Sequence, residues 1–393
     1  MQTGEKKFLS ANWFPFLTAI LLSVIGTLFI YSACSIRADK AVQTLHISHI
    51  RFLLVGLVLV PAAAWINYRF VLRWSWLFYL ITIGLLISVL VFGSSTMGAK
   101  RWVFGIQPSE LAKMAVVLVL AQFLGKARRF RDFRGLLFSG LIAGIPTVLI
   151  LIQPDLGTAL ALVPTVLAML FTANVSPKLF WTLILTGILA VSFELGAIYL
   201  VERGNLTPER QEQVIRLTGL RPHQIKRIHV FLFPDKDPLG SGYNKRQSEI
   251  AVGSGGLWGK GWCRGNQNLL GYLPPSVSAN DFIFPVLAEE LGFAGSALIL
   301  FLFLGGILIP GIWIGCRCAD DSGKILVAGI TTLLFCHVFI NISMTVGLVP
   351  ITGIPLPFIS YGGTFMLSMM MMIGLLESVS LHGEQQEDLF TAD

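Results

Sequence analysis

The polar segment from Gly240 to Asp281 combines residue types that bind phosphate or sugar groups. Its glycines would let backbone N–H groups approach an anionic ligand or a sugar closely, Lys260 would add a point charge, and Trp258 would add a stacking face. The segment is not a Walker loop, because no strand precedes it and a Gly-Lys-Ser/Thr order is absent. Further polar candidates in the same segment are Gln247, Ser254 and Gln267.

A second group of charges lies around residue 110. Arg101 is followed by Gln107-Pro108-Ser109-Glu110, which leads into an apolar stretch that contains Lys113. A lysine inside a membrane span is costly unless it is paired, and Glu110 lies one helical turn earlier on the same side. The pair is either a structural ion pair or part of a substrate cavity, and the sequence leaves both open.

Three more polar features interrupt apolar stretches. Asp155 in Gln153-Pro154-Asp155-Leu156-Gly157 would either cap the next helix or act as a functional carboxylate. Glu289 and Glu290 follow Asp281 within the next apolar stretch. The run from Pro355 to Gly363, which includes Ser360, contains two prolines and two glycines, and this pattern predicts a broken helix that lines a polar cavity.

The composition identifies the elements that must position these residues. Hydrophobic residues make up 54% of the chain, charged residues 13%, and mean hydropathy is +0.73, values outside the range of soluble domains. We therefore predict an all-α integral membrane protein with ten transmembrane helices. The expected spans are Trp13–Tyr31, Phe52–Ile66, Trp76–Phe92, Leu111–Phe123, Leu136–Ile152, Thr158–Phe171, Leu179–Val201, Phe282–Ile314, Ile325–Val346 and Leu356–Ser378.

Loop charges predict the orientation. The first span lacks a small-residue cleavage site and is expected to be retained. Loops on the side of the N-terminus carry more Lys and Arg than the short loops opposite, so both termini are expected in the cytoplasm. Residues 202–281 then form a large extracytoplasmic loop within a single membrane domain, residues 1–393. The five cysteines have neither a disulfide pattern nor metal-ligand spacing.

Several motifs occur in an order that resembles the SEDS family (shape, elongation, division, sporulation). They are QPSELAK, QPDLGTAL, GSGGLWGKGW, DFIFPVLAEELGF and GLVPITGIPLPFISYGG. The resemblance covers nearly all of the hydrophobic chain. It implies a peptidoglycan glycosyltransferase that polymerises lipid II, the undecaprenyl-diphosphate disaccharide-pentapeptide, on the outer face of the bacterial cytoplasmic membrane. Its implied partners are a class B penicillin-binding protein and other membrane proteins of the elongation complex, with no nucleic acid.

The resemblance also implies a catalytic role for Asp281, the carboxylate before the Phe-Ile-Phe run. The reaction needs a base for the acceptor hydroxyl and cations for the diphosphate, and Lys260, Arg101 and Lys113 are expected to supply charge. The dipole of the following helix should lower the pKa of Asp281 unless the site desolvates it. Coordination of a divalent cation, Mg²⁺ or Mn²⁺, by Asp281 is therefore an alternative role.

The segment before Asp281 departs from the usual family pattern. Most relatives have Leu-Pro-Glu and then His-Thr immediately before the aspartate, whereas this chain has Leu273-Pro274-Pro275-Ser276-Val277-Ser278-Ala279-Asn280. The segment thus lacks the Glu and the His. The remaining residues predicted to contact substrate are Glu110, Asp155, Glu290 and Ser360.

Other functions fit the same sequence. A lipid II flippase would use Glu110, Lys113 and Glu290 and the broken last helix as a translocation path. A non-catalytic scaffold would leave the buried charges unexplained, and the division counterpart of the same polymerase would share its motifs. The polymerase is favoured because the polar clusters fall on the outer side, where lipid II arrives.

Overall fold

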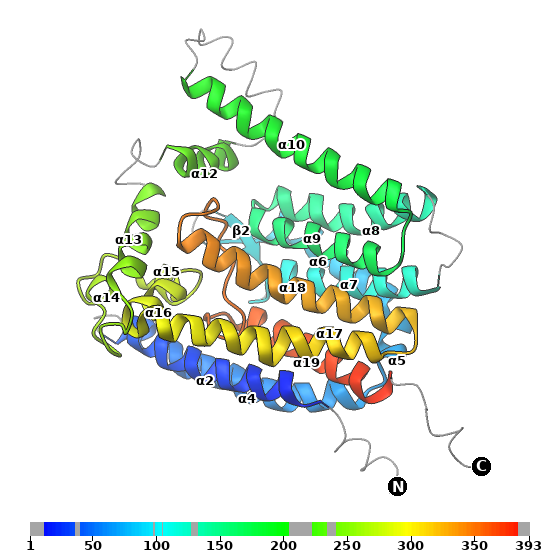
Figure 1. Cartoon of the computed structure of the whole chain (residues 1–393), viewed down its shortest axis with the longest axis horizontal. Coiled ribbons are helices and arrows are strands. Elements are labelled where there is room, and N and C mark those ends of the chain that lie inside the picture. The colour runs from blue at the N-terminus through cyan, green and yellow to red at the C-terminus, as the bar shows by residue number, and fades with distance from the viewer. Residues whose placement is uncertain are drawn as a thin grey trace, which may run out of the picture.

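The protein is a bundle of long apolar helices with several short helices gathered at one end (Figure 1). The computed structural model describes residues 12–35, 40–96, 99–103, 105–126, 133–203, 222–233 and 241–383. Within these ranges nine helical segments are long and apolar enough to cross a membrane, and a tenth apolar helix, Leu156–Thr172, is shorter. The prediction of about ten transmembrane helices is confirmed.

The long elements are α2 (Phe14–Cys34), α4 (Leu45–Trp65), α6 (Ser75–Phe92), α7 (Pro108–Lys126), α8 (Phe133–Ile152), α9 (Leu156–Thr172), α10 (Pro177–Arg203), α16 (Ile283–Phe303), continued by the π-helix η2 (Leu304–Leu308) and α17 (Ile309–Arg317), then α18 (Asp321–Thr345) and α19 (Gly363–His382). Short elements are α3 (Lys40–Gln43), α5 (Tyr68–Arg73), α12 (Pro222–Leu232), α13 (Ser241–Ser254), α14 (Asn266–Leu269) and α15 (Pro275–Ser278). An antiparallel pair, β1 (Ser94–Thr96) and β2 (Ala99–Trp102), was not expected from the sequence.

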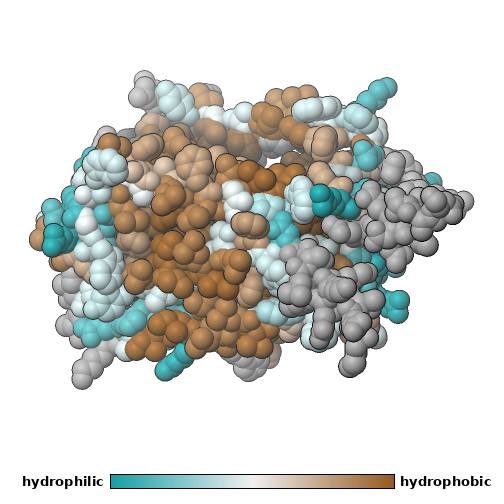
Figure 2. Space-filling model, turned by 60° about the horizontal axis from the view of Figure 1, so that its bottom comes forward, coloured by the Kyte–Doolittle hydropathy of each residue, from teal (hydrophilic) through white to brown (hydrophobic). Residues whose placement is uncertain are grey.

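The outer surface of the bundle is apolar, whereas polar side chains are buried inside it. Figure 2 shows hydrophobic residues over the middle of the molecule and hydrophilic residues toward its two ends. Exposed side chains include Phe14, Leu54 and Val148. Helices α7, α18 and α19 form the centre, with 78%, 72% and 72% of their spans buried, compared with 11% for α10. This distribution is that of a multi-pass membrane protein.

The two ends of the described chain meet at one end of the bundle. The backbone N–H of Asn12 donates to Oγ of Ser380, at 3.3 Å, so α2 begins where α19 ends. The opposite end carries the hairpin, the start of α9 and the helices α13 to α15 (Figure 1). These are the segments in which the sequence predicted functional residues.

Two interruptions shape this second end. Gly292 has φ 69° and ψ −169° and divides α16 into two helical segments. Residues 348–362 contain no regular helix, and α19 begins only at Gly363. The expected last span, Leu356–Ser378, therefore starts too early, because Pro355, Pro357 and the two glycines prevent helix formation before residue 363 rather than kinking a helix.

Candidate active site

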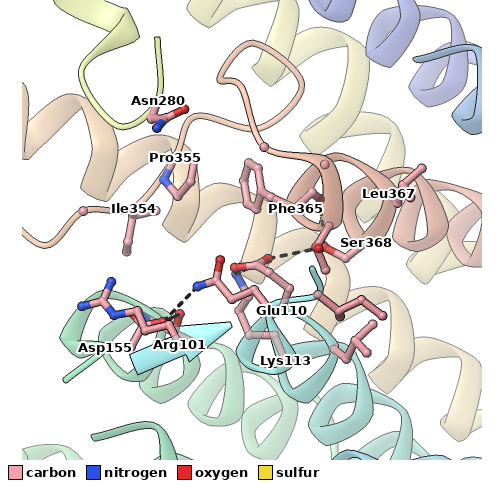
Figure 3. A pocket seen from close by; sticks show the side chains of 18 of the residues that line it. Arg101, Glu110, Lys113, Asp155, Asn280, Ile354, Pro355, Phe365, Leu367 and Ser368 are labelled. Atoms are coloured by element: carbon pink, nitrogen blue, oxygen red, sulfur yellow. Dashed lines mark hydrogen bonds and ion pairs between the residues drawn. The ribbon is translucent and has the colours of Figure 1, made fainter. Parts of the chain in front are cut away.

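The end of the bundle that carries the hairpin, the start of α9 and helices α13 to α15 is called the polar end below. A cavity of about 1040 Å³ opens among its loops and continues into the bundle (Figure 3). Its polar lining comes from distant parts of the chain: Arg101, Gln107, Glu110, Lys113, Asp155, Arg227, Asn280, Asp281, His337 and Ser368. Its apolar lining includes Phe52, Leu59, Met114, Leu367 and Met371. The cavity thus joins five residues that the sequence analysis singled out: Arg101, Glu110, Lys113, Asp155 and Asp281.

Asp281 lies between α15 and α16 at the polar end of the cavity. Burial raises the pKa of its carboxyl to about 6, even though Arg227 and Arg101 act in the opposite direction. The structure therefore meets the exception stated for the helix dipole, since the site desolvates this carboxyl. A carboxylate with a pKa near 6 is a better base at neutral pH than an exposed aspartate.

Two guanidinium groups share this end of the cavity. Arg101 on β2 donates to the carbonyl of Pro154, and Arg227 on α12 donates to the carbonyl of Thr352 at 3.0 Å. Burial and the nearby charge of Arg101 lower the pKa of Arg227, although a guanidinium remains protonated at neutral pH. Sequence reasoning missed Arg227, since no motif distinguishes it from the other basic residues of the outer loop. Two cations beside one carboxylate form a site suited to phosphate oxygens.

Asp155 has a structural role at the same site. Its carboxylate caps α9 by accepting from the backbone N–H of Thr158 at 3.3 Å and from the Thr158 hydroxyl at 3.0 Å. It also accepts from Ser109 Oγ at 3.1 Å and Gln107 Nε2 at 3.4 Å. The expected capping role is confirmed, and the same side chain ties the start of α7 to the start of α9 while it lines the cavity (Figure 3).

The deeper part of the cavity contains a buried ion pair. Lys113 Nζ lies 2.9 Å from Glu110 Oε2 and 2.9 Å from His337 Nε2, and Ser368 Oγ lies 3.4 Å from Glu110. Lys113 is fully buried and Glu110 almost so. The predicted pairing is confirmed, and both side chains line the cavity. Their contact with substrate stays a prediction. His337 was not identified from the sequence, since a lone His in an apolar span gives no signal of its partner.

Ser360 lies near Asp281 but faces the backbone. Its Oγ donates to the carbonyl of Asn280 at 2.6 Å and accepts from the N–H of Leu356 at 2.7 Å. The hydroxyl therefore holds the segment before Asp281 against residues 356–360. Contact between Ser360 and substrate stays a prediction.

Four of the remaining predicted contact residues, Ser254, Lys260, Gln267 and Glu290, belong to a separate cluster. We call it the Glu289 cluster, and its other members are Ser32, Cys263 and Glu289. Lys260 Nζ lies 2.6 Å from Glu289 Oε1 and 2.8 Å from Ser254 Oγ. The backbone N–H of Gln267 donates to Glu289 at 3.2 Å. Glu290 accepts from Ser32 and from the N–H of Cys263. None of these residues lines the cavity.

Glycines let the loop of this cluster pack directly on α16. A Cβ at Gly259 would lie 2.2 Å from the carbonyl oxygen of Glu290, and one at Gly292 would lie 2.2 Å from the Gly259 nitrogen. The N–H groups of Lys260 and Gly261 donate to the carbonyls of Glu289 and Glu290, each at 3.0 Å. These glycines thus serve backbone packing. Gln247 on α13 and the exposed Trp258 also lie outside the cavity lining, and their substrate contacts stay predictions.

No group of three or more His, Cys, Asp or Glu side chains with the arrangement of a metal site occurs among the described residues. Asp281 and Asp155 are two oxygen donors in one cavity, but Arg101 and Arg227 also face it. The donor set therefore fits a phosphate-bearing ligand better than a protein-held cation.

Comparison with known proteins identifies the family of this chain. Residues 12–385 match the cell cycle protein family FtsW/RodA/SpoVE. The chain belongs to this family. It is 35% identical over 370 residues to the peptidoglycan glycosyltransferase MrdB of Escherichia coli K12, covering 92% of this chain and 93% of MrdB. It is 31% identical over 418 residues to the peptidoglycan glycosyltransferase RodA of Treponema pallidum, covering 93% and 96%.

Solved structures share the fold of this FtsW/RodA/SpoVE protein. A chain of a peptidoglycan synthase complex that coordinates polymerization and crosslinking aligns with a TM-score of 0.72 at 25% identity, over 95% of this chain and 98% of that one. RodA of Thermus thermophilus aligns with a TM-score of 0.65 at 23% identity, over 96% and 99%. The second likeness supports the fold alone.

Proposed function

We propose that this chain is a peptidoglycan glycosyltransferase that polymerises lipid II into glycan strands during cell-wall elongation and maintenance of cell shape. The observation that carries the proposal is the cavity in which Asp281 lies with Arg101 and Arg227 at the polar end and apolar walls lead into the bundle. The names of the relatives and the family membership point to the same activity.

The cavity supplies the groups that the reaction needs. An acceptor sugar hydroxyl attacks the anomeric carbon of a second lipid-linked sugar, an O–C bond forms, and the bond from that carbon to the diphosphate oxygen breaks. Asp281 accepts the hydroxyl proton, and the diphosphate leaves with the bonding electrons. Arg101 and Arg227 stabilise its charge, so no second carboxylate acid is required.

The apolar lining accounts for the lipid part of the substrate. Phe52 and Leu59 on α4, Met114 on α7 and Met371 on α19 extend the cavity wall toward the middle of the bundle. An apolar wall lets part of the polyprenyl chain pass from the bilayer into the cavity without exposure to water. The diphosphate would then lie where the apolar wall meets the arginines.

The topology follows from the same placement. The polar end carries the cavity mouth, and lipid II reaches the outer face of the cytoplasmic membrane, so this end is the extracytoplasmic one. Both termini then lie in the cytoplasm, in agreement with the loop charges. We further propose one membrane domain, residues 1–393, with residues 202–281 as its outer loop; residues 204–221 and 234–240 of that loop lie outside the described residues.

A class B penicillin-binding protein is the partner that this function requires, since glycan strands must be crosslinked. The solved complex in which a similar chain takes part concerns polymerization together with crosslinking. Other membrane proteins of the elongation complex complete the proposed set of partners, and nucleic acid is not among them.

Labelled lipid II tests the proposal. Purified protein with its class B transpeptidase is compared as wild type, Asp281→Asn and Asp320→Asn, a matched change at the cap of α18 on the other end of the bundle. Long strands from wild type and Asp320→Asn, and none from a folded Asp281→Asn protein, are expected. Strands from Asp281→Asn would overturn the assignment. Transbilayer movement of lipid II without strands would indicate the flippase.

The same assay separates the two roles of Asp281. A general base works after chelation of Mg²⁺ and Mn²⁺, whereas a cation ligand does not. We expect EDTA to leave most of the activity. Loss of activity with EDTA and its recovery with Mn²⁺ would instead assign Asp281 to a cation site.

A further inference from the structure

We propose that Asn341 is the positioning residue for Asp281: its amide fixes the backbone of Asp281 to the cavity wall formed by residues 353–355. This inference rests on the proposed function, in which Asp281 is the base. Nothing in the sequence motifs assigns a role to Asn341, which lies inside an apolar helix, α18.

The side-chain NH₂ group of Asn341 donates two short hydrogen bonds, each to a different backbone carbonyl. Its Nδ2 donates to the carbonyl of Asp281 at 2.8 Å and to the carbonyl of Ile354 at 2.7 Å. The side chain is fully buried. Because both partners are acceptors, only the NH₂ side of the amide can face them. One side chain on a central helix therefore links two segments that are 73 residues apart in sequence.

The orientation has a cost that supports a specific role. Oδ1 of Asn341 is buried and has no hydrogen-bond partner. An unpaired buried acceptor typically costs about 1 to 3 kcal/mol. An apolar side chain at residue 341 would avoid this cost in the α18 interior, but it would release both carbonyls. The structure thus uses a polar residue where the linkage of Asp281 to Ile354 requires it.

The linked segments are the ones that define the reacting geometry. Ile354 and Asp281 both line the cavity, and a Cβ on the neighbouring Gly353 would lie 3.6 Å from Oδ2 of Asp281. Ser360 and the N–H of Tyr361 hold the carbonyls of Asn280 and Ala279. Asn341 alone among these three holds Asp281 itself.

Release of this linkage should admit water to the carboxyl. The charged groups that act on Asp281 are Arg227 and Arg101, which lower its pKa, while burial raises it to about 6. If residue 281 moves toward solvent, burial weakens and the arginines remain. The pKa should then move toward the ordinary value of about 3.9.

The test uses Asn341→Leu, which removes the donor. A second variant, Asn341→Ser, keeps a single donor and serves if Asn341→Leu folds poorly. Asn268→Leu is the matched control, because Asn268 is also buried, donates to a backbone carbonyl (Ser32, 2.7 Å) and has an unpaired Oδ1, but does not line the cavity. The readouts are strand synthesis as kcat and KM, its pH profile, and thermal unfolding.

We expect both Asn341 variants to lose at least about tenfold in kcat with little change in KM, since small misplacement of a reacting group costs that much. In their pH profiles, the loss of activity in acid should occur at a lower pH than in wild type. Asn268→Leu should show only a lower unfolding temperature. If folded Asn341 variants have the kcat of wild type and lose activity in acid at the same pH, the positioning role is overturned. Equal kcat losses in the Asn268 and Asn341 variants would overturn it too. Activity of Asp281→Asn would instead contradict the role of Asp281 as the base. That result is distinguishable from a failure of the Asn341 proposal, because it is measured on a different variant.

Discussion

Nζ of Lys113 lies 2.9 Å from Nε2 of His337, and the same ammonium group lies 3.0 Å from Oε1 of Glu110. An ammonium group has only donors, so Nε2 of His337 must accept and the imidazole is neutral, with its proton on Nδ1. One cation is thus shared by a carboxylate and a neutral acceptor inside the bundle. The Lys113 side chain thus has two acceptors inside the bundle, of which only one is acidic.

Substitution of His337 should show whether the acceptor matters. His337→Leu removes the bond to a charged donor and should destabilise the fold by about 1.5 to 3 kcal/mol. In His337→Gln, an amide oxygen can replace Nε2, so most stability should return. Thermal unfolding in detergent measures the difference. Equal unfolding temperatures for the Leu and Gln variants would contradict the shared-cation arrangement.

Removal of one member of the Lys113–Glu110 pair should cost more than removal of both. Lys113→Met leaves Glu110 buried without its cation, and such losses are about 3 to 5 kcal/mol. Lys113→Met with Glu110→Gln leaves no uncompensated charge, so the double variant should be more stable than either single variant. A double-mutant cycle on unfolding free energies measures the coupling. Additive losses would show that the two side chains act independently.

The activity should fall in acid as Asp281 becomes protonated. With a pKa of about 6, half of the carboxyl is ionised near pH 6, and the base form decreases tenfold for each pH unit below. Stability has the opposite sign. A folded pKa above the unfolded value favours the protonated carboxyl in the fold, so its contribution is full below about pH 3.9 and is lost as the pH rises through 6. Profiles of kcat/KM and of unfolding temperature against pH check the two expectations, with Asp281→Asn as the reference for stability.

The membrane fold and part of the site could be predicted from the sequence because their signals are local. Runs of apolar residues specify the helices, and the spacing of Glu110 and Lys113 specifies their pair. The capping role of Asp155 follows from its place before Leu156. The pair and the cap each depend on residues within one helical turn, and each span depends on one continuous stretch of sequence.

Contacts between distant segments could not be predicted. Arg227 reaches the cavity from α12, where it donates to the carbonyl of Thr352, and His337 reaches it because α18 packs against α7 and α9. Neither residue has a motif. Conversely, the sequence singles out Lys260 by its charge but does not show that it pairs with Glu289. The burial that raises the pKa of Asp281 likewise depends on three-dimensional packing.

The Glu289 cluster gives a prediction for Lys260. Its ammonium is bound by Glu289 and Ser254, and Glu289 is 1% exposed. Lys260→Met should therefore lower the unfolding temperature while KM for lipid II stays near that of wild type, because a buried carboxylate loses its cation. Thermal unfolding and strand synthesis are measured on the same preparation. A raised KM at unchanged stability would instead support direct contact between Lys260 and substrate.

Gly353 offers the sharpest probe of the space around the base. Its φ is +78°, and an added Cβ would lie 3.6 Å from Oδ2 of Asp281. Gly353→Ala should thus combine backbone strain of about 1 kcal/mol with a methyl group in contact with the carboxylate. Gly256→Ala is the matched control, since Gly256 also has positive φ, +57°, but faces open space. Both variants should lose similar stability, whereas only Gly353→Ala should lose strand synthesis, because the methyl group occupies the approach of the acceptor hydroxyl to Asp281. Equal activity of the two variants would mean that the hydroxyl reaches Asp281 from another side of the cavity.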